Sequence, residues 1–270
     1  MRKTLTYDIE ELEPYINWLY FYHAWGLSGK PQEAKDKMKA EAEVMLKSFR
    51  PKYKTKAVFL LADANSDGDD ILLNGVRLPM LRQQRPSRPD GPNLCLADFI
   101  RPLSSGIKDR MGAFATTVDI RMETEYESDP YQRMLAQTLA DRLAEATVEK
   151  MHQEVRTQWW GYAPDEHLTI NELLEERFQG IRPAVGYPSM PDTSVNFLLS
   201  SLLDMQEIGI RLTTVGAMKP HASVSGLMFS HPKAHYFDLG PIGEDQLRDY
   251  AHRRGVPVEL MRRYLASHLE

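Results

Sequence analysis

Apolar residues along the chain follow two spacings, one typical of helices and one typical of short strands. Turn residues at 65–68 and at 74–75 separate β-type runs and predict hairpins. Between 130 and 159 the spacing is helical, and the apolar positions of one face are Tyr131, Leu135, Leu139, Leu143 and Ala146. Helices are predicted over about 8–30, 31–50, 130–159, 169–178 and 194–208 and in two closing segments. Strands are predicted over 58–61, 71–73, 76–78, 94–100, 112–120, 211–217, 227–232 and 236–242.

The order of these elements is mixed, with hairpins and helices interspersed rather than in strict alternation. Such an order predicts an α+β fold with an antiparallel or mixed sheet. No internal repeat, low-complexity tail or domain boundary interrupts the chain. We therefore expect a single domain over 1–270, with an N-terminal helical region over about 1–50.

Composition narrows the class of protein. The 270 residues are 42% hydrophobic and 26% charged, and no apolar run approaches the roughly 20 residues that span a bilayer. The first residues contain no apolar signal segment. The single cysteine, Cys95, excludes internal disulfides and cysteine-based metal clusters, and the net charge of −5 disfavours nucleic-acid binding. We expect a cytoplasmic protein without membrane or nucleic-acid partners.

Two motifs imitate metal sites. The stretch 63–70 begins like a calcium loop, but its twelfth position is Asn74 instead of glutamate, and its flanks are β-type. His221, His231 and His235 lack the spacing of a metal-binding set. We interpret the first as an acidic turn and the second as separate histidines. No metal ligands and no catalytic residues are assigned, because nucleophile elbows, phosphate loops and dinucleotide fingerprints are all absent from the sequence.

The segment 182–188 has the residues to hold an amino acid attached to a nucleoside. Arg182 is able to bind a carboxylate through two parallel hydrogen bonds. Prolines stiffen the segment, and Gly186 permits a close approach of backbone to ligand. Tyr187 offers an aromatic face to a sulfonium cation or to a flat base. A purely structural proline-rich loop is the alternative that these residues leave open.

The same segment resembles part of a known protein family. RPAVGYPSMPD (182–192) is similar to the RPAxGYPxxPDH stretch of the activation domain of cobalamin-dependent methionine synthase. Further blocks resemble that domain in the same order, and together they cover essentially the whole chain. These blocks are GDDI (68–71), LRQQ (81–84), CLADFI (95–100), GAFA (112–115), LADRLAEA (139–146), WGYAPDE (160–166), EERFQGIRPA (175–184), GIRLTTVGAMKPHASVSGLMFSHPKAHYF (209–237) and GEDQLRDYAHRRG (243–255).

The resemblance implies a fold and an activity. The family fold is a single C-shaped α+β domain around a twisted antiparallel sheet with flanking helices. The family domain binds S-adenosylmethionine and presents it to cobalamin that has oxidised to cob(II)alamin, while a flavodoxin-like donor supplies one electron and methylcobalamin is regenerated. The expected cofactors are S-adenosylmethionine and a cobalamin carried by the partner.

Family site residues transfer to matching positions of this chain. Arg182 matches the arginine that holds the ligand carboxylate, and Tyr236 matches a ligand-contacting tyrosine. The remaining matches are the loop residues Ala184, Gly186 and Tyr187 and two glutamates near the site, Glu145 and Glu176. From helical spacing alone, Glu145 lies off the apolar stripe and is equally well explained as a solvated residue.

Two positions depart from the family pattern. Asn17 stands where the family has an aspartate for the ligand's amino group, and Thr193 replaces a histidine. Asn17 still accepts a hydrogen bond but has no charge, which weakens the bond by about 1 kcal/mol or more. The alternative function is therefore a docking or regulatory module of a corrinoid protein that no longer binds S-adenosylmethionine well.

The sequence lacks the substrate barrels of methionine synthase and the D-x-H-x-x-G motif that ligates cobalamin. The chain by itself is thus not expected to be a methionine synthase. It is expected to stand alone and to act in trans on a cobalamin-binding methionine synthase or another corrinoid protein, or to be one part of a split enzyme.

Overall fold

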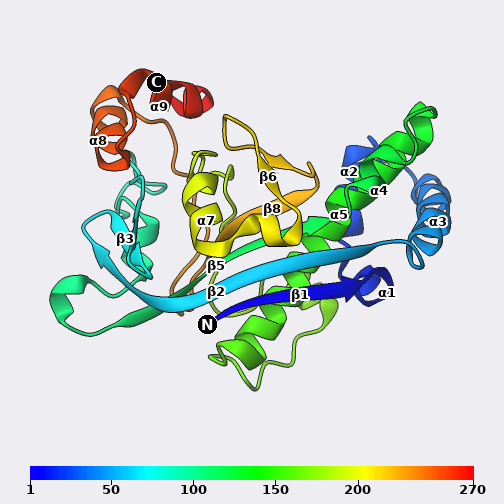
Figure 1. The fold of residues 1–270 in the computed structure, drawn as a ribbon, viewed down its shortest axis with the longest axis horizontal. Helices are drawn as coiled ribbons and strands as arrows, with labels where there is room; N and C mark the ends of the chain where they lie inside the picture. Colours follow the sequence, from blue (N-terminus) through cyan, green and yellow to red (C-terminus); the bar gives the residue numbers. More distant parts are fainter.

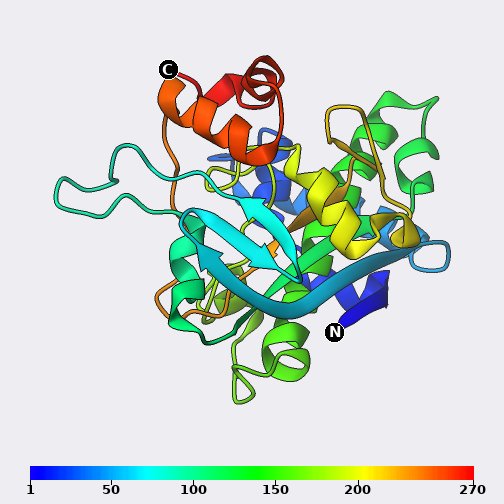
Figure 2. The same cartoon turned by 60° about the vertical axis from the view of Figure 1, so that its left-hand side comes forward.

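A computed structural model describes all residues from 1 to 270, and its centre is one long, curved strand (Figures 1 and 2). Every pairing in the six-stranded sheet is antiparallel. The strands follow the order β4-β3-β2-β5-β8, and β1 pairs with β2 on the edge that β3 also uses. The strands are β1 (Arg2–Asp8), β2 (Lys54–Asp67), β3 (Asp70–Leu73), β4 (Val76–Pro79), β5 (Asp109–Val118) and β8 (Ser223–Met228), with β6 (Arg211–Leu212) and β7 (Met218–Lys219) in a separate hairpin.

Helices flank this sheet on both faces. The N-terminal and central helices are α1 (Ile9–Leu12), α2 (Trp18–Ala24), α3 (Gln32–Phe49), α4 (Arg121–Thr124), α5 (Pro130–Glu154) and α6 (Ile170–Leu174). The later ones are α7 (Val195–Leu203), α8 (Glu244–Arg254) and α9 (Val258–Tyr264). Short 3-10 turns are η1 (Glu13–Tyr15), η2 (Leu96–Phe99), η3 (Leu103–Ser105), η5 (Met205–Ile208) and η6 (Ala266–His268), and one π-turn is η4 (Val155–Trp159). None of the helices combines the length and the apolar composition that a bilayer span requires.

The apolar run in β2 is continuous because both faces of the sheet are covered. Val58 and Leu60 point to one core, which α7, α8 and α9 also build. Phe59 and Leu61 point to the other core, beneath α3 and α5. Alternate residues of a strand face opposite sides, so this single run supplies both cores.

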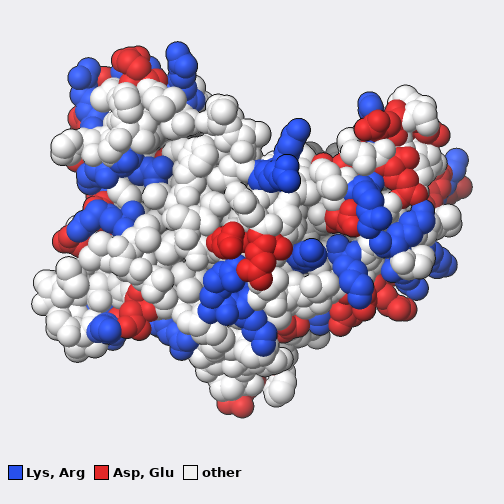
Figure 3. Space-filling view, viewed as in Figure 1, with Lys and Arg blue, Asp and Glu red and all other residues white.

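The predicted fold class is confirmed: an α+β domain with a curled antiparallel sheet and flanking helices. The pair α8 and α9 forms one arm, and α2 to α5 form the other (Figure 1). Both arms point upward in the view of Figure 1, and the hollow between them gives the outline of a broad C in the space-filling view (Figure 3).

Several of the predicted elements need correction. The region over about 1–50 is not helical throughout, because residues 2–8 form β1 against β2. Residues 94–100 contain η2 instead of a strand, since Asp98 accepts a hydrogen bond from the Cys95 amide at 2.9 Å and closes a turn. Only residues 211–212 of 211–217 are in a strand. Residues 236–242 have no partner strand, and Gly240 bends them with φ +75°.

The apolar spacing predicted the buried face of the long helix α5 with one exception. Helix α5 buries Leu135, Leu139, Leu143 and Ala146, as expected. Tyr131 is instead 45% exposed and bonds to Glu41 through its phenol at 2.5 Å. The capping box predicted at Thr169 is present, with Glu172 accepting from the Thr169 amide at 2.9 Å.

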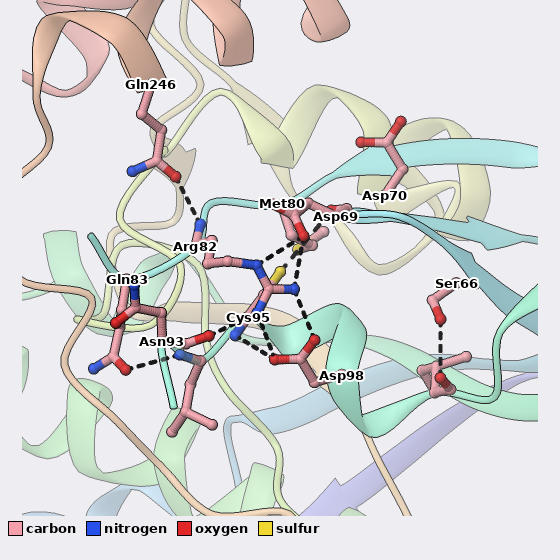
Figure 4. A network of polar contacts seen from close by, with 12 residues as sticks. Ser66, Asp69, Asp70, Met80, Arg82, Gln83, Asn93, Cys95, Asp98 and Gln246 are labelled. Atoms are coloured by element: carbon pink, nitrogen blue, oxygen red, sulfur yellow. Dashed lines mark hydrogen bonds and ion pairs between the residues drawn. The ribbon is translucent and has the colours of Figure 1, made fainter. Parts of the chain in front are cut away.

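The arginine- and proline-rich loop over 82–93 projects from the body (Figure 2), and Arg82 holds its base (Figure 4). The Arg82 guanidinium donates to Asp69 and to Asp98, each at 2.7 Å, and to the Asn93 carbonyl at 2.6 Å. Cys95 lies in the same network, where burial raises the pKa of its thiol to about 12. The loop therefore has a rigid base.

Candidate functional site

A cavity of about 650 Å³ opens beside the loop that follows α6. It is lined by the N-terminal region, helix α5, the end of α6 and the loop over 182–189, with Phe114 of β5 and Val224 of β8 at the sheet and residues 236–238 closing one side. Seven of the eight residues proposed from the sequence lie in its wall, namely Asn17, Glu145, Glu176, Arg182, Ala184, Tyr187 and Tyr236. The fold thus gathers them although they span 220 positions of the chain.

Backbone hydrogen bonds attach the site loop to the edge strand β8. The Leu227 amide donates to the Pro183 carbonyl at 3.0 Å, and the Val185 amide donates to the Ser225 carbonyl at 2.9 Å. Gly226 allows this contact, because a Cβ there would lie 2.2 Å from the Pro183 carbonyl oxygen. The loop is therefore placed by the sheet and not only by its prolines.

Gly186 is the one proposed residue outside the cavity wall. Its φ is +89°, a conformation that residues with a side chain rarely adopt, and its amide donates to the Met190 carbonyl at 2.8 Å. An added Cβ would meet only Thr193 Cγ2, at 3.8 Å. Its positive φ turns the loop back beside the cavity.

Arg182 is held by a residue that the sequence analysis missed. Its guanidinium forms an ion pair with Glu149, and the two side chains are only 10% and 11% exposed. Glu149 lies four residues after Glu145 on α5, so both carboxylates emerge on the same face of the helix. This spacing is the signal that would have pointed to Glu149.

Two tyrosines frame the pair. The Tyr236 phenol accepts a hydrogen bond from the Arg182 amide at 3.0 Å, and burial raises the pKa of Tyr236. The Tyr187 phenol donates to Glu145 at 3.2 Å. The charge of Glu145, with burial, raises the pKa of Tyr187 to about 12. Both phenols therefore stay neutral at physiological pH.

Asn17 reaches the cavity from the start of α2. Its side-chain oxygen accepts a hydrogen bond from the Leu19 amide at 3.1 Å and caps the helix. The amide side chain is thus already fixed in the wall of the cavity. This local role was not foreseen, and it leaves the side-chain NH₂ group without a hydrogen bond to the protein.

The cavity has an excess of negative charge. Five carboxylates line it, together with two guanidiniums: Glu145, Glu149, Glu175, Glu176, Asp238, Arg142 and Arg182. Burial raises the pKa of Glu176, whose φ of +57° is unusual for a residue with a side chain. Aromatic surface comes from Tyr15, Tyr20 and Phe237, which the sequence did not indicate. Such a site favours a ligand with a positive charge and one carboxylate.

The other motifs do not belong to this cavity. Residues 63–67 continue β2, so the turn predicted over 65–68 begins later, at Gly68. His221 lies 3.6 Å from Asp141, whereas His231 and His235 pack against Phe99. No group of three or more His, Cys, Asp or Glu side chains is arranged to hold a metal ion.

Comparisons with known proteins show the family of this chain. Residues 8–255 match the family model for the activation domain of vitamin B12-dependent methionine synthase. The crystal structure of the MetH reactivation domain bound to AdoHcy superposes on the chain with a TM-score of 0.94 at 36% sequence identity. The match covers 100% of this chain and 90% of that one. The chain therefore belongs to the family of vitamin B12-dependent methionine synthase activation domains.

Proposed function

We propose that the acidic cavity binds S-adenosylmethionine. The observation that carries this proposal is the position of Arg182, the guanidinium in the loop wall of a cavity otherwise rich in carboxylates. S-adenosylmethionine has the complementary charges, one carboxylate beside an ammonium and a sulfonium. The similar MetH domain binds AdoHcy, the product left by methyl transfer from this donor.

Each part of the ligand has a matching group in the cavity. Arg182 offers its Nη1 to the carboxylate, since Glu149 accepts only from Nη2. Asn17, Glu145 and Glu176 supply acceptors for the ammonium. The face of Tyr187 and the excess negative charge favour the sulfonium. Ala184 leaves the loop wall open to the adenosine portion.

We further propose that the domain supports reductive methylation on a partner. When bound, S-adenosylmethionine supplies the methyl group that, with one electron from a flavodoxin-like donor, converts cob(II)alamin on a cobalamin-binding methionine synthase or another corrinoid protein to methylcobalamin. The residues of this chain contribute binding and orientation, while the cofactors carry the chemistry. A cytoplasmic setting is part of this proposal.

The alternative is a docking or regulatory module that has lost the methyl donor. The uncharged Asn17 is the observation that favours it. Calorimetric titration with S-adenosylmethionine separates the two functions. Measurable binding supports the reactivation role. Absence of binding, together with retained affinity for a cobalamin-loaded partner domain, supports the docking module.

A further inference from the structure

Glu149 and Arg182 form a pair that is nearly buried but incompletely bonded. Glu149 Oε1 accepts from Arg182 Nη2. The second oxygen, Oε2, and the Arg182 Nε are both buried and have no hydrogen-bond partner. Nε lies on the same edge of the guanidinium as Nη2, so these two atoms are the unclosed half of a parallel, two-bond contact between Arg182 and Glu149. The pair lies in the cavity wall, where a ligand carboxylate would meet it.

The surroundings prevent Arg182 from turning into the interior. Its guanidinium lies 5.8 Å from the Phe178 ring, and Arg156 lies 4.1 Å from the same ring. Glu166 holds Arg156 with two bonds, at 2.7 and 2.8 Å, and His152 accepts a third at 2.8 Å. A second cation therefore stands behind Phe178, and Glu149 is the only carboxylate that bonds to Arg182.

A ligand carboxylate that reaches Arg182 also meets Glu149. Two carboxylates that share one buried site do not both stay ionised, because like charges in a medium of low polarity repel strongly. One of them then takes up a proton from solvent. The group that shares the guanidinium and lies deepest is Glu149, whose side chain is 11% exposed.

The surroundings of Glu149, apart from Arg182, also favour its protonated form. Burial is the main influence that raises the pKa of Glu149, Arg182 lowers this pKa, and Glu145 on the same helix and Glu176 after α6 add to the rise. Tyr236, from the segment after β8, and Tyr15 and Asn17, from the N-terminal region, face the cavity without charge. When a ligand carboxylate shares Arg182, the one stabilising influence on ionised Glu149 weakens.

We propose that Glu149 is the positioning residue of Arg182 and takes up one proton when a ligand carboxylate binds there. Before a ligand binds, ionised Glu149 holds the guanidinium in the cavity wall. In the complex, protonated Glu149 removes the repulsion between the two carboxyl groups. This inference deepens the proposed function and rests on it.

The test counts protons by calorimetry with S-adenosylhomocysteine, which has the carboxylate and ammonium but no sulfonium. Titrations at about pH 7 in two buffers of different ionisation enthalpy give the number of protons bound per ligand, expected between roughly half and one. Affinity should fall by up to about tenfold per pH unit as the pH rises above the pKa of Glu149. Glu149→Gln, which keeps the hydrogen bond to Arg182, should bind without proton uptake and with little dependence on pH.

Two controls make the assignment specific. Glu154→Gln changes a carboxylate on the same helix that lies outside the cavity wall, and it should retain the proton uptake. The decarboxylated analogue of S-adenosylhomocysteine keeps the ammonium and should bind to the unaltered protein without proton uptake. Binding of S-adenosylhomocysteine without protons, or unchanged uptake in Glu149→Gln, overturns this inference alone. Absence of any binding overturns the proposed function as well.

Discussion

The Tyr187 phenol donates a hydrogen bond to Glu145 at 3.2 Å and so joins the site loop to helix α5. The contact links residues 42 positions apart in the sequence. It also places the negative charge of Glu145 beside the aromatic ring that we assign to the sulfonium. The geometry of the loop and the electrostatics of the cavity therefore depend on the same pair.

This pair predicts a pH effect. The pKa of Tyr187 is raised to about 12 by Glu145 and by burial, so the neutral phenol is favoured in the folded state. Its contribution to stability is complete below the unfolded pKa near 10 and is lost as the pH rises through about 12. In an ultraviolet titration of tyrosinate, Tyr187→Phe should lack one late-titrating group. Glu145→Gln should shift that group toward 10, and an unshifted group would contradict the pairing.

Arg182→Ala should abolish or severely weaken binding of S-adenosylmethionine, because it removes the partner of the ligand carboxylate. The same change leaves Glu149 nearly buried without a counter-ion, which commonly costs about 3–5 kcal/mol of stability. Adding Glu149→Gln should recover much of the stability but none of the binding. Denaturation curves measure the change in stability, and titration calorimetry measures the change in affinity. Unchanged affinity in Arg182→Ala would refute the site.

Asn17→Asp should tighten binding, because a charged acceptor replaces a neutral one for the ligand's ammonium. The gain should be about 1–2 kcal/mol, or roughly five- to thirtyfold in affinity. The helix cap at Leu19 should persist, since aspartate and asparagine cap about equally well, and stability should change little. S-adenosylhomocysteine should gain similarly, whereas an analogue without the amino group should not. Equal gains for all three ligands would indicate a general electrostatic effect.

Gly226→Ala should displace the site loop. The new Cβ would lie 2.2 Å from the Pro183 carbonyl oxygen and 3.0 Å from the Ala184 Cα, so strand β8 and the loop must separate. We expect at least about 1–3 kcal/mol of destabilisation and a loss of ligand affinity. Gly186→Ala meets no close neighbour, and its cost of about 1–3 kcal/mol comes from its positive φ alone. Unchanged binding in Gly226→Ala would show that the loop contact does not place the site.

The dependence on a partner is also testable. The chain alone should neither purify with a corrinoid nor make methionine, because it lacks the cobalamin-ligating motif. A cobalamin-loaded partner domain, a reductant and S-adenosylmethionine should together yield methylcobalamin, which absorption spectra detect. Omitting this chain from the mixture is the control. Tight binding of cobalamin by the chain alone would contradict action in trans.

Local sequence patterns predicted correctly the elements that depend on residues only a few positions apart. The apolar spacing of α5 predicted its buried face at Leu135 and Leu139, and the Thr169–Glu172 pair predicted the start of α6. The pattern of apolar residues gave wrong predictions where strand pairing decides the structure. Residues 94–100 and 236–242 have the composition of strands but no partner strand. A strand exists only when another strand satisfies its backbone, and that partner lies elsewhere in the chain.

The sequence by itself determined the family, the α+β class and the loop that contains Arg182, because each of these is read from neighbouring residues or from their order. The tertiary structure alone decided that Glu149 holds Arg182, that Gly186 turns the loop without lining the cavity, and that Asn17 caps α2 while facing the site. Ion pairs and cavities depend on distances between remote segments, and these distances follow from the register of β2, β5 and β8 and from the packing of α5 on them.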